Sequence, residues 1–230
     1  MTELLPLMLL GAVIGLDVVC FPQMMYSRPL VAATLAGAFV GDATRGLLVG
    51  VLLELIAIAT LPFGASRYPE WGSAAVVGGA IAATLHTDRA GVITLGVLAG
   101  LATAWAGGWT LVKLRQWNAY LARRRRPALD AGARGAVIGL QLAGLTGDLV
   151  RAALLTGVAY AVLFPVAVHL AGAWSFSGPP SRSVVILLAT AVATSAAWVI
   201  FHSARGARWY FAGGVAVDVD DALLGIARDR

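Results

Sequence analysis

One stretch of the sequence, residues 22–73, constrains the fold more than any other. Between a few polar residues it is almost wholly apolar, and prolines and glycines divide it into short runs. Glu54 stands in the middle of one of these runs. An unpaired carboxylate costs several kcal/mol at least in an apolar core or a lipid-facing helix. Polar groups spaced between broken apolar helices are typical of a substrate site at membrane depth. The stretch therefore predicts a polar site within a membrane protein.

The composition agrees with a membrane protein. Of the 230 residues, 59% are hydrophobic and 13% are charged, and the mean hydropathy is +0.82. A soluble domain carries about a quarter charged residues. Long continuous apolar runs indicate membrane helices, because the strands of a barrel would show alternation instead. We predict an all-α integral membrane protein, a polytopic helical bundle with broken or re-entrant helices.

The apolar runs differ in length. Runs long enough for a span, or nearly so, are expected at residues 4–20, 44–61, 90–112, 152–173 and 183–202. Residues 30–40 and 135–145 are too short to cross a bilayer of about 30 Å. They are followed by Gly41-Asp42 and Gly147-Asp148, which suggests broken helices. Residues 73–85 are rich in Gly and Ala, which allow close helix packing in lipid.

The two ends of the chain carry further expectations. Asp17 lies near the end of the first apolar run, where an interfacial cap and a functional role are equally compatible with the sequence. The first residues lack the basic region of a signal peptide, so the first run is expected to stay in the mature protein. Residues 1–208 are expected to form the membrane domain. Residues 209–230 carry Asp218, Asp220 and Asp221, and we expect an interfacial or cytoplasmic tail there.

The basic residues are concentrated in one place. The net charge is +5 and the pI is near 10.0, yet seven of the 17 basic residues lie within residues 113–134. We expect a cytoplasmic loop there, in contact with anionic headgroups, because the positive-inside rule explains such a cluster better than nucleic-acid binding does.

The segment 64–72 holds two aromatic side chains, Tyr68 and Trp71, beside Glu70. They suit equally an interfacial aromatic belt and the stacking of a sugar ring. His86 and Asp88 lack a third partner for a metal site. We find no dinucleotide-binding, phosphate-loop, zinc-protease or nucleophile-elbow motif. Cys20 is the only cysteine, which excludes a disulfide framework. We expect neither a cofactor nor a metal.

A set of motifs points to one family. They are Ser27-Arg28-Pro29-Leu30, Gly41-Asp42, Glu54 and the segment from Gly64 to Ser73. In this order and spacing the chain resembles the membrane-spanning IIC component of the mannose/fructose/sorbose family of bacterial sugar phosphotransferase systems. The similarity is strongest over residues 15–79 and looser up to about residue 213.

The resemblance implies a sugar permease subunit in the bacterial cytoplasmic membrane, a multi-pass protein that carries a hexose inward with a IID partner. Family members resemble elevator-type carriers and form oligomers. The IIB subunit, which receives phosphate through IIA, phosphorylates the sugar. The IIC chain itself carries no phosphorylated residue and is not an enzyme, so neither Cys20 nor His86 is expected to accept phosphate.

The resemblance also suggests five substrate-binding residues: Gln23, Arg28, Asp42, Glu54 and Glu70. Our hypothesis is that the carboxylates accept hydrogen bonds from sugar hydroxyls while Arg28 compensates their charge. Structural roles are the alternative, since Arg28 could only pair with a carboxylate and Asp42 could only cap a helix.

The chain departs from the family at its C-terminus, where an acidic and basic tail replaces a further apolar segment. This leaves open a reduced, non-transporting scaffold or regulatory relative that binds phosphotransferase-system partners. An unrelated small membrane enzyme is disfavoured by the missing motifs.

Overall fold

The structure, a computed structural model, describes residues 4–17, 20, 22–58, 68–85 and 91–173, with a few isolated positions between 186 and 197. Within these ranges all regular secondary structure is helical, which confirms the all-α expectation. The helices are α1 (Leu4–Leu16), α2 (Pro29–Phe39), α3 (Ala43–Ile58), α4 (Trp71–Thr84), α5 (Gly91–Arg124), α6 (Arg126–Asp130) and α7 (Arg134–Ala173). His86 and Asp88, most of the expected span at 183–202 and the tail at 209–230 lie outside the described residues.

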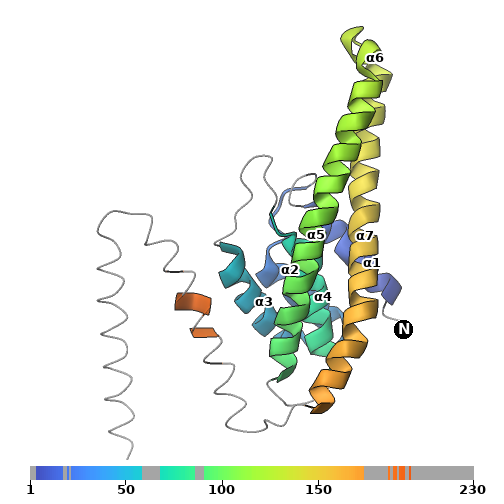
Figure 1. The fold of residues 1–230 in the computed structure, drawn as a ribbon. Coiled ribbons are helices and arrows are strands. Elements are labelled where there is room, and N and C mark those ends of the chain that lie inside the picture. Colours follow the sequence, from blue (N-terminus) through green and yellow to red (C-terminus); the bar gives the residue numbers. More distant parts are fainter. Residues whose placement is uncertain are drawn as a thin grey trace, which may run out of the picture.

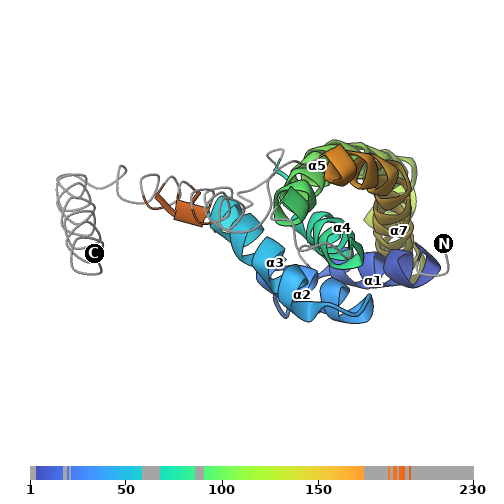
Figure 2. The same ribbon diagram turned by 90° about the horizontal axis from the view of Figure 1, so that it is seen from below.

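Helix α4 is the centre of the fold. All residues from Gly72 to Ala83 are buried, and the helix packs against α1, α2, α3, α5 and α7. Figure 2 shows α4 enclosed by these neighbours. Gly and Ala make up most of α4, so neighbouring backbones can approach it closely. The sequence prediction of a close-packing helix at residues 73–85 is thereby confirmed.

Helices α2 and α3 form a short hairpin. Pro29 opens α2 directly after Arg28, a position that suits proline because its missing N–H has no helical partner there. Gly41 closes the hairpin at a φ of 102°, a conformation that side-chain-bearing residues rarely adopt. α2 has 11 residues and α3 has 16. The short run at 30–40 is therefore a short helix, as expected, whereas the described part of the run at 44–61 is shorter than a full span.

Helices α5 and α7 are the long elements of the molecule. They run side by side, and α6 joins their far ends (Figure 1). Both are long and apolar enough to cross a membrane, with 34 residues in α5 and 40 in α7. At 1.5 Å per residue these lengths are about 50 and 60 Å. The spans expected at 90–112 and 152–173 thus fall within helices that continue well beyond them.

The basic segment 113–134 is a helical hairpin, and the prediction of a loop was wrong. α5 continues to Arg124, α6 follows, and α7 begins at Arg134. Most residues of the segment are strong helix formers, namely Ala, Leu, Arg, Lys and Gln. The charged residues therefore lie on an exposed helix and not in a loop. We call residues 112–147 the projecting hairpin, because none of them is buried. It extends past the other helices in Figure 1.

The short run expected at 135–145 is part of a long helix. α7 is continuous from Arg134 to Ala173, so Gly147-Asp148 and Arg151 do not interrupt it, and Pro165 lies inside the helix. The reason is local: Arg151 donates from Nε to the Asp148 carboxylate at 2.8 Å, one turn apart on the same face. The polar pair is satisfied within the helix, and the helix need not break to expose it.

Candidate functional site

The start of α2 brings two of the five predicted residues together. The Arg28 guanidinium forms an ion pair with one carboxylate oxygen of Glu54 on α3. The second oxygen accepts a hydrogen bond from the Leu30 backbone N–H at 3.2 Å. The Arg28 and Glu54 side chains are 37% and 16% exposed. The carboxylate in the apolar run is therefore compensated by a cation and by the helix N-terminus, and the pair stays accessible.

Asp42 lies at the opposite end of α2. Its Oδ1 accepts a hydrogen bond from the Arg45 backbone N–H at 3.0 Å, which caps α3. Its Oδ2 pairs with Arg45 Nε at 3.1 Å. The 11 residues of α2 place Asp42 about 16 Å from Arg28 along the helix axis. Asp42 thus has the capping role that the sequence left open, and it is not brought to the Arg28–Glu54 pair.

Gln23 is exposed on the connection between α1 and α2, with a φ of 61°. Asp17, 2% exposed, holds this connection in place. Its carboxylate accepts hydrogen bonds from Met24 N at 2.7 Å and from the backbone N–H and hydroxyl of Ser27, each at 3.0 Å. Of the two roles open for Asp17, the structure shows a structural one, since three donors converge on it.

Glu70 is buried at 3% exposure and caps α4. Its Oε1 accepts a hydrogen bond from Ser73 N at 3.1 Å. Its Oε2 and the Ser73 hydroxyl have no hydrogen-bond partner among the described residues. A Cβ added at Gly107 of α5 would fall 2.6 Å from the Glu70 Cβ, so glycine is needed there for Glu70 to fit. Glu70 therefore lies on the α5 side of α4, apart from the α2–α3 hairpin.

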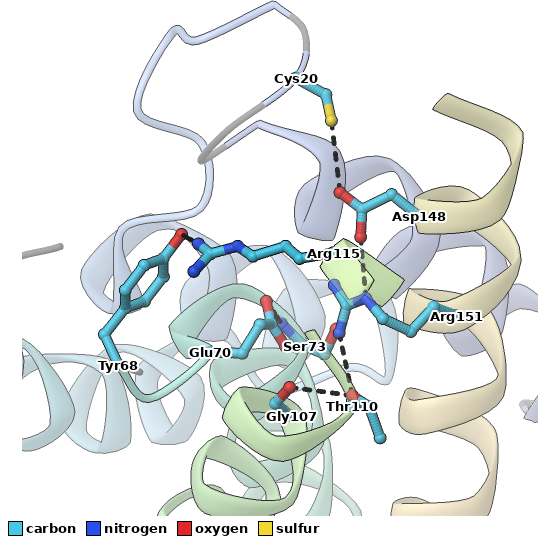
Figure 3. Close-up of polar contacts among 9 residues, drawn as sticks. All are labelled: Cys20, Tyr68, Glu70, Ser73, Gly107, Thr110, Arg115, Asp148 and Arg151. Carbon is cyan, nitrogen blue, oxygen red and sulfur yellow. Dashed lines mark hydrogen bonds and ion pairs between the residues drawn. The ribbon is translucent and has the colours of Figure 1, made fainter. Parts of the chain in front are cut away.

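A polar network near Glu70 was not assigned to the site from the sequence (Figure 3). The Cys20 thiol donates to Asp148 Oδ2 at 3.3 Å, and Arg151 joins Asp148 Oδ1 at 2.8 Å to the Thr110 hydroxyl at 3.4 Å. Figure 3 shows the Arg151 guanidinium pointing toward the Glu70 carboxylate. The available signal was an acid and a base three residues apart in an apolar run.

Two further features border this network. The Arg115 guanidinium donates from Nη2 to the Tyr68 hydroxyl at 2.5 Å and lies 4.8 Å from the centre of the Tyr68 ring. Tyr68 is 7% exposed, and Arg115 covers a face of its ring. Partial burial and the neighbouring Asp148 carboxylate raise the pKa of the Cys20 thiol to about 11.

The structure thus separates the predicted residues into two groups. Arg28 and Glu54 meet on the α2–α3 hairpin, with Gln23 on the connection that leads into it. Glu70 lies with the network of α5 and α7, and α4 stands between that network and the α2–α3 hairpin (Figure 2). In the part of the chain that the structure describes, no three His, Cys, Asp or Glu side chains are placed to hold a metal ion.

Known proteins with related sequences are components of bacterial phosphotransferase systems. The sorbose-specific EIIC component of Klebsiella pneumoniae is 32% identical over 80 residues, which cover 35% of this chain and 29% of that protein. The mannose-specific EIIC component of Escherichia coli strain K12 is 25% identical over 132 residues, covering 57% of this chain and 48% of that protein. The aligned part therefore spans less than half of these relatives.

Solved structures and a family model extend the comparison. A chain in the cryo-EM structure of the mannose transporter ManYZ with microcin E492 has the same fold, with a TM-score of 0.61 and 17% identity over 98% of this chain and 94% of that one. Residues 1–162 match the family model described as the phosphotransferase (PTS) system sorbose-specific IIC component. This match covers most of the chain, including Arg28, Glu54 and Glu70, and the protein belongs to that family of sugar-specific IIC components.

Proposed function

We propose that this protein is the sugar permease subunit of a phosphoenolpyruvate-dependent phosphotransferase system, which binds a hexose and carries it inward. The observation that carries the proposal is the Arg28–Glu54 pair at the start of α2. It places a cation, a carboxylate and a helix N-terminus side by side, at the end of α2 opposite the Asp42–Arg45 pair. Such a cluster is costly in lipid, and charged groups at membrane depth commonly line a substrate path.

The chemistry of the pair suits a sugar. A sugar hydroxyl can donate to a Glu54 oxygen while a neighbouring hydroxyl accepts from the Arg28 guanidinium. Gln23, exposed on the preceding connection, is proposed to supply an amide. We propose direct sugar contact for these three residues. We also propose that Asp42 and Glu70 bind the substrate. Because each caps a helix in this structure, we propose that they contact the sugar only after it has entered.

The proposal includes partners and a location. The chain is proposed to work with a IID membrane subunit, and the IIB subunit, charged through IIA, phosphorylates the incoming hexose. A multi-pass position in the bacterial cytoplasmic membrane is supported by the two helices long enough to span it. Elevator-type movement within an oligomer is proposed from the division between short helices α1–α4 and the long pair α5 and α7.

Uptake measurements test this proposal. Cells expressing the chain alone, or with the IID and IIB subunits of the same organism, are given labelled mannose, fructose or sorbose. Uptake that requires the partners and yields sugar phosphate is the expected result. Glu54→Gln should abolish this uptake. Asp130→Asn is the control and should leave uptake unchanged, because the Asp130 side chain is 72% exposed in its ion pair with Arg126. Normal uptake by Glu54→Gln would remove Glu54 from the site.

The projecting hairpin favours one alternative, a non-transporting scaffold that binds phosphotransferase-system partners. Its tip carries Arg123, Arg124, Arg125 and Arg126, all exposed and away from the apolar body. A scaffold uses such a tip and has no need of Glu54. A complex that assembles with the partners but takes up no sugar would favour this alternative.

A further inference from the structure

A cleft of about 690 Å³ lies where the projecting hairpin leaves the body of the protein. Its walls are side chains of α5 and α7, together with Cys20. We call it the hairpin-base cleft. Its polar lining residues are Arg115, Asn118, Gln141 and Asp148, and leucines complete the walls. Small-molecule sites have volumes of about 300–1,000 Å³ with a few convergent polar groups, so the cleft has the size and lining of a binding site.

One guanidinium group, that of Arg115, lines this cleft. Arg115 is held over the Tyr68 ring by a hydrogen bond to the Tyr68 hydroxyl. A guanidinium has five N–H donors, so it can serve Tyr68 and an anion together. Arg125 lies outside this lining and against α7, where a Cβ on Gly139 would fall 2.7 Å from its Nη1. A guanidinium binds a phosphate group with well-defined geometry, so Arg115 favours an anion in the cleft.

The remaining polar groups suit hydroxyls. Asn118 on α5 reaches α7, where a Cβ on Gly144 would lie 3.6 Å from its Nδ2. Gln141 lines the cleft from α7. Each amide both donates and accepts hydrogen bonds, which matches the two-way bonding of a hydroxyl. Between them the leucine side chains offer an apolar surface to a carbon skeleton.

The one carboxylate in the lining does not oppose an anion strongly. Asp148 is 2% exposed, and Arg151 pairs with it at 2.8 Å. Its charge is therefore compensated from within α7, and its oxygens remain as acceptors at the base of the cleft. The lining of the cleft thus combines one cation, two amides and a carboxylate whose charge is compensated.

We propose that the hairpin-base cleft binds a phosphorylated polyol, with the phosphate on Arg115 and the hydroxyls on Asn118, Gln141 and Asp148. Two sources supply this chemistry: a soluble sugar phosphate and the phosphoglycerol headgroup of an anionic lipid. The soluble source rests on the proposed function, since sugar phosphate is the product of the coupled phosphorylation. The site is separate from the Arg28–Glu54 pair, so it would sense product or lipid and not the incoming sugar.

The lone cysteine makes the test direct. Cys20 lines the cleft and is the only cysteine in the sequence, so the rate of its alkylation by a maleimide reports occupancy. The full chain in phosphatidylcholine nanodiscs is alkylated with mannose-6-phosphate, mannose or inorganic phosphate present. A parallel sample contains phosphatidylglycerol in the nanodisc and no soluble ligand. Slower alkylation with mannose-6-phosphate identifies the soluble source, and slower alkylation only with phosphatidylglycerol identifies the lipid.

Matched variants assign the effect to the cleft. Arg115→Gln should weaken binding by about 10- to 100-fold, the factor that accompanies loss of a hydrogen bond to a charged group. Arg124→Gln is the control, because Arg124 stacks on Tyr120 outside the cleft. Gln141→Leu, compared with Gln116→Leu on the other side of α5, repeats the test with uncharged side chains that leave Tyr68 undisturbed.

Several results would overturn the proposal: no protection by either phosphate source, equal protection by mannose, equal protection by inorganic phosphate, or equal loss in the control variants. Uptake is measured in a separate experiment, so the permease proposal and the cleft proposal can each fail without the other. Protection without any uptake would count against the permease and leave the cleft intact. Uptake without protection would count against the cleft alone.

Discussion

The Arg28 guanidinium and the Glu54 carboxylate meet where α2 begins, and Glu54 also accepts the backbone N–H of Leu30. One carboxylate thus joins α3 to the start of α2 through a side chain and a peptide group. This arrangement explains how an acidic residue persists in an apolar run, because both of its oxygens have partners. It also defines the first experiment on the proposed sugar site.

Glu54→Gln keeps the shape of the side chain and removes its charge. The amide nitrogen cannot accept a hydrogen bond, so either Arg28 or the sugar loses an acceptor. We expect hexose uptake to fall by at least about tenfold, the effect of losing one charge-assisted hydrogen bond. Uptake of labelled sugar, normalised to the amount of protein in the membrane, is the measurement. An unchanged rate would contradict the proposed role.

Gly107→Ala should destabilise the protein through packing alone. The new Cβ would lie 2.6 Å from the Glu70 Cβ and 2.9 Å from Leu155 Cδ2, so neighbouring helices must shift. Overpacking of this kind costs about 1–3 kcal/mol. Gly135→Ala is the matched control, because nothing lies within 4 Å of its Cβ position, and helix propensity favours alanine by up to about 1 kcal/mol there. Thermal unfolding in detergent compares the two, and equal midpoints would refute the packing argument.

Asp148→Asn should be among the most damaging changes in α7. It leaves the guanidinium of Arg151 without its anion, and the two side chains are only 3% and 9% exposed. Breaking one partner of a buried ion pair costs about 3–5 kcal/mol. Asp130→Asn removes a pair that is 72% and 78% exposed and should change little. The free energy of unfolding in denaturant is the measurement, and a similar loss in both variants would contradict the role of burial.

Cys20 should be a slow thiol at neutral pH. Only the thiolate reacts with a maleimide. Cys20 is exposed at the surface, yet partial desolvation of its thiol and the neighbouring Asp148 carboxylate raise the pKa of Cys20 to about 11. The thiolate fraction, and with it the rate, should rise about tenfold per pH unit below that pKa. In denaturant the pKa returns toward about 8.5 and the rate at pH 8 should increase. Asp148→Asn should also lower the pKa of Cys20 and increase the alkylation rate, in this case in the folded protein. A folded-state rate that levels off near pH 9 would contradict the assignment.

Local signals made the α2–α3 hairpin predictable from the sequence. Pro29 and Gly41 mark the two ends of α2, and Asp42 is a standard helix cap. The charge of Glu54 demanded a partner, and Arg28 was a candidate because both lie in the same short region of the chain. In such cases the forces that fix the structure act between neighbours in sequence.

The network around Asp148 could not be predicted in the same way. Cys20 and Asp148 are 128 positions apart, and only the packing of α1 against α7 brings them together. The helical structure of the projecting hairpin was missed for another reason. Its charges resemble those of a membrane-flanking loop, although its residues favour helix. The charge pattern predicted a loop and the helix propensities predicted a helix, and the structure has the helix.

The position of α4 has a consequence for how the molecule comes apart. Because α4 contacts the α2–α3 hairpin on one side and α1, α5 and α7 on the other, separating either group strips the same helix of its cover. The body should therefore lose its amide protection in a single cooperative step, while the projecting hairpin, without a buried residue, exchanges its protons first. Hydrogen exchange should divide α5 into a slow lower part and a fast upper part along one unbroken helix, with the boundary near Leu111, its last buried residue.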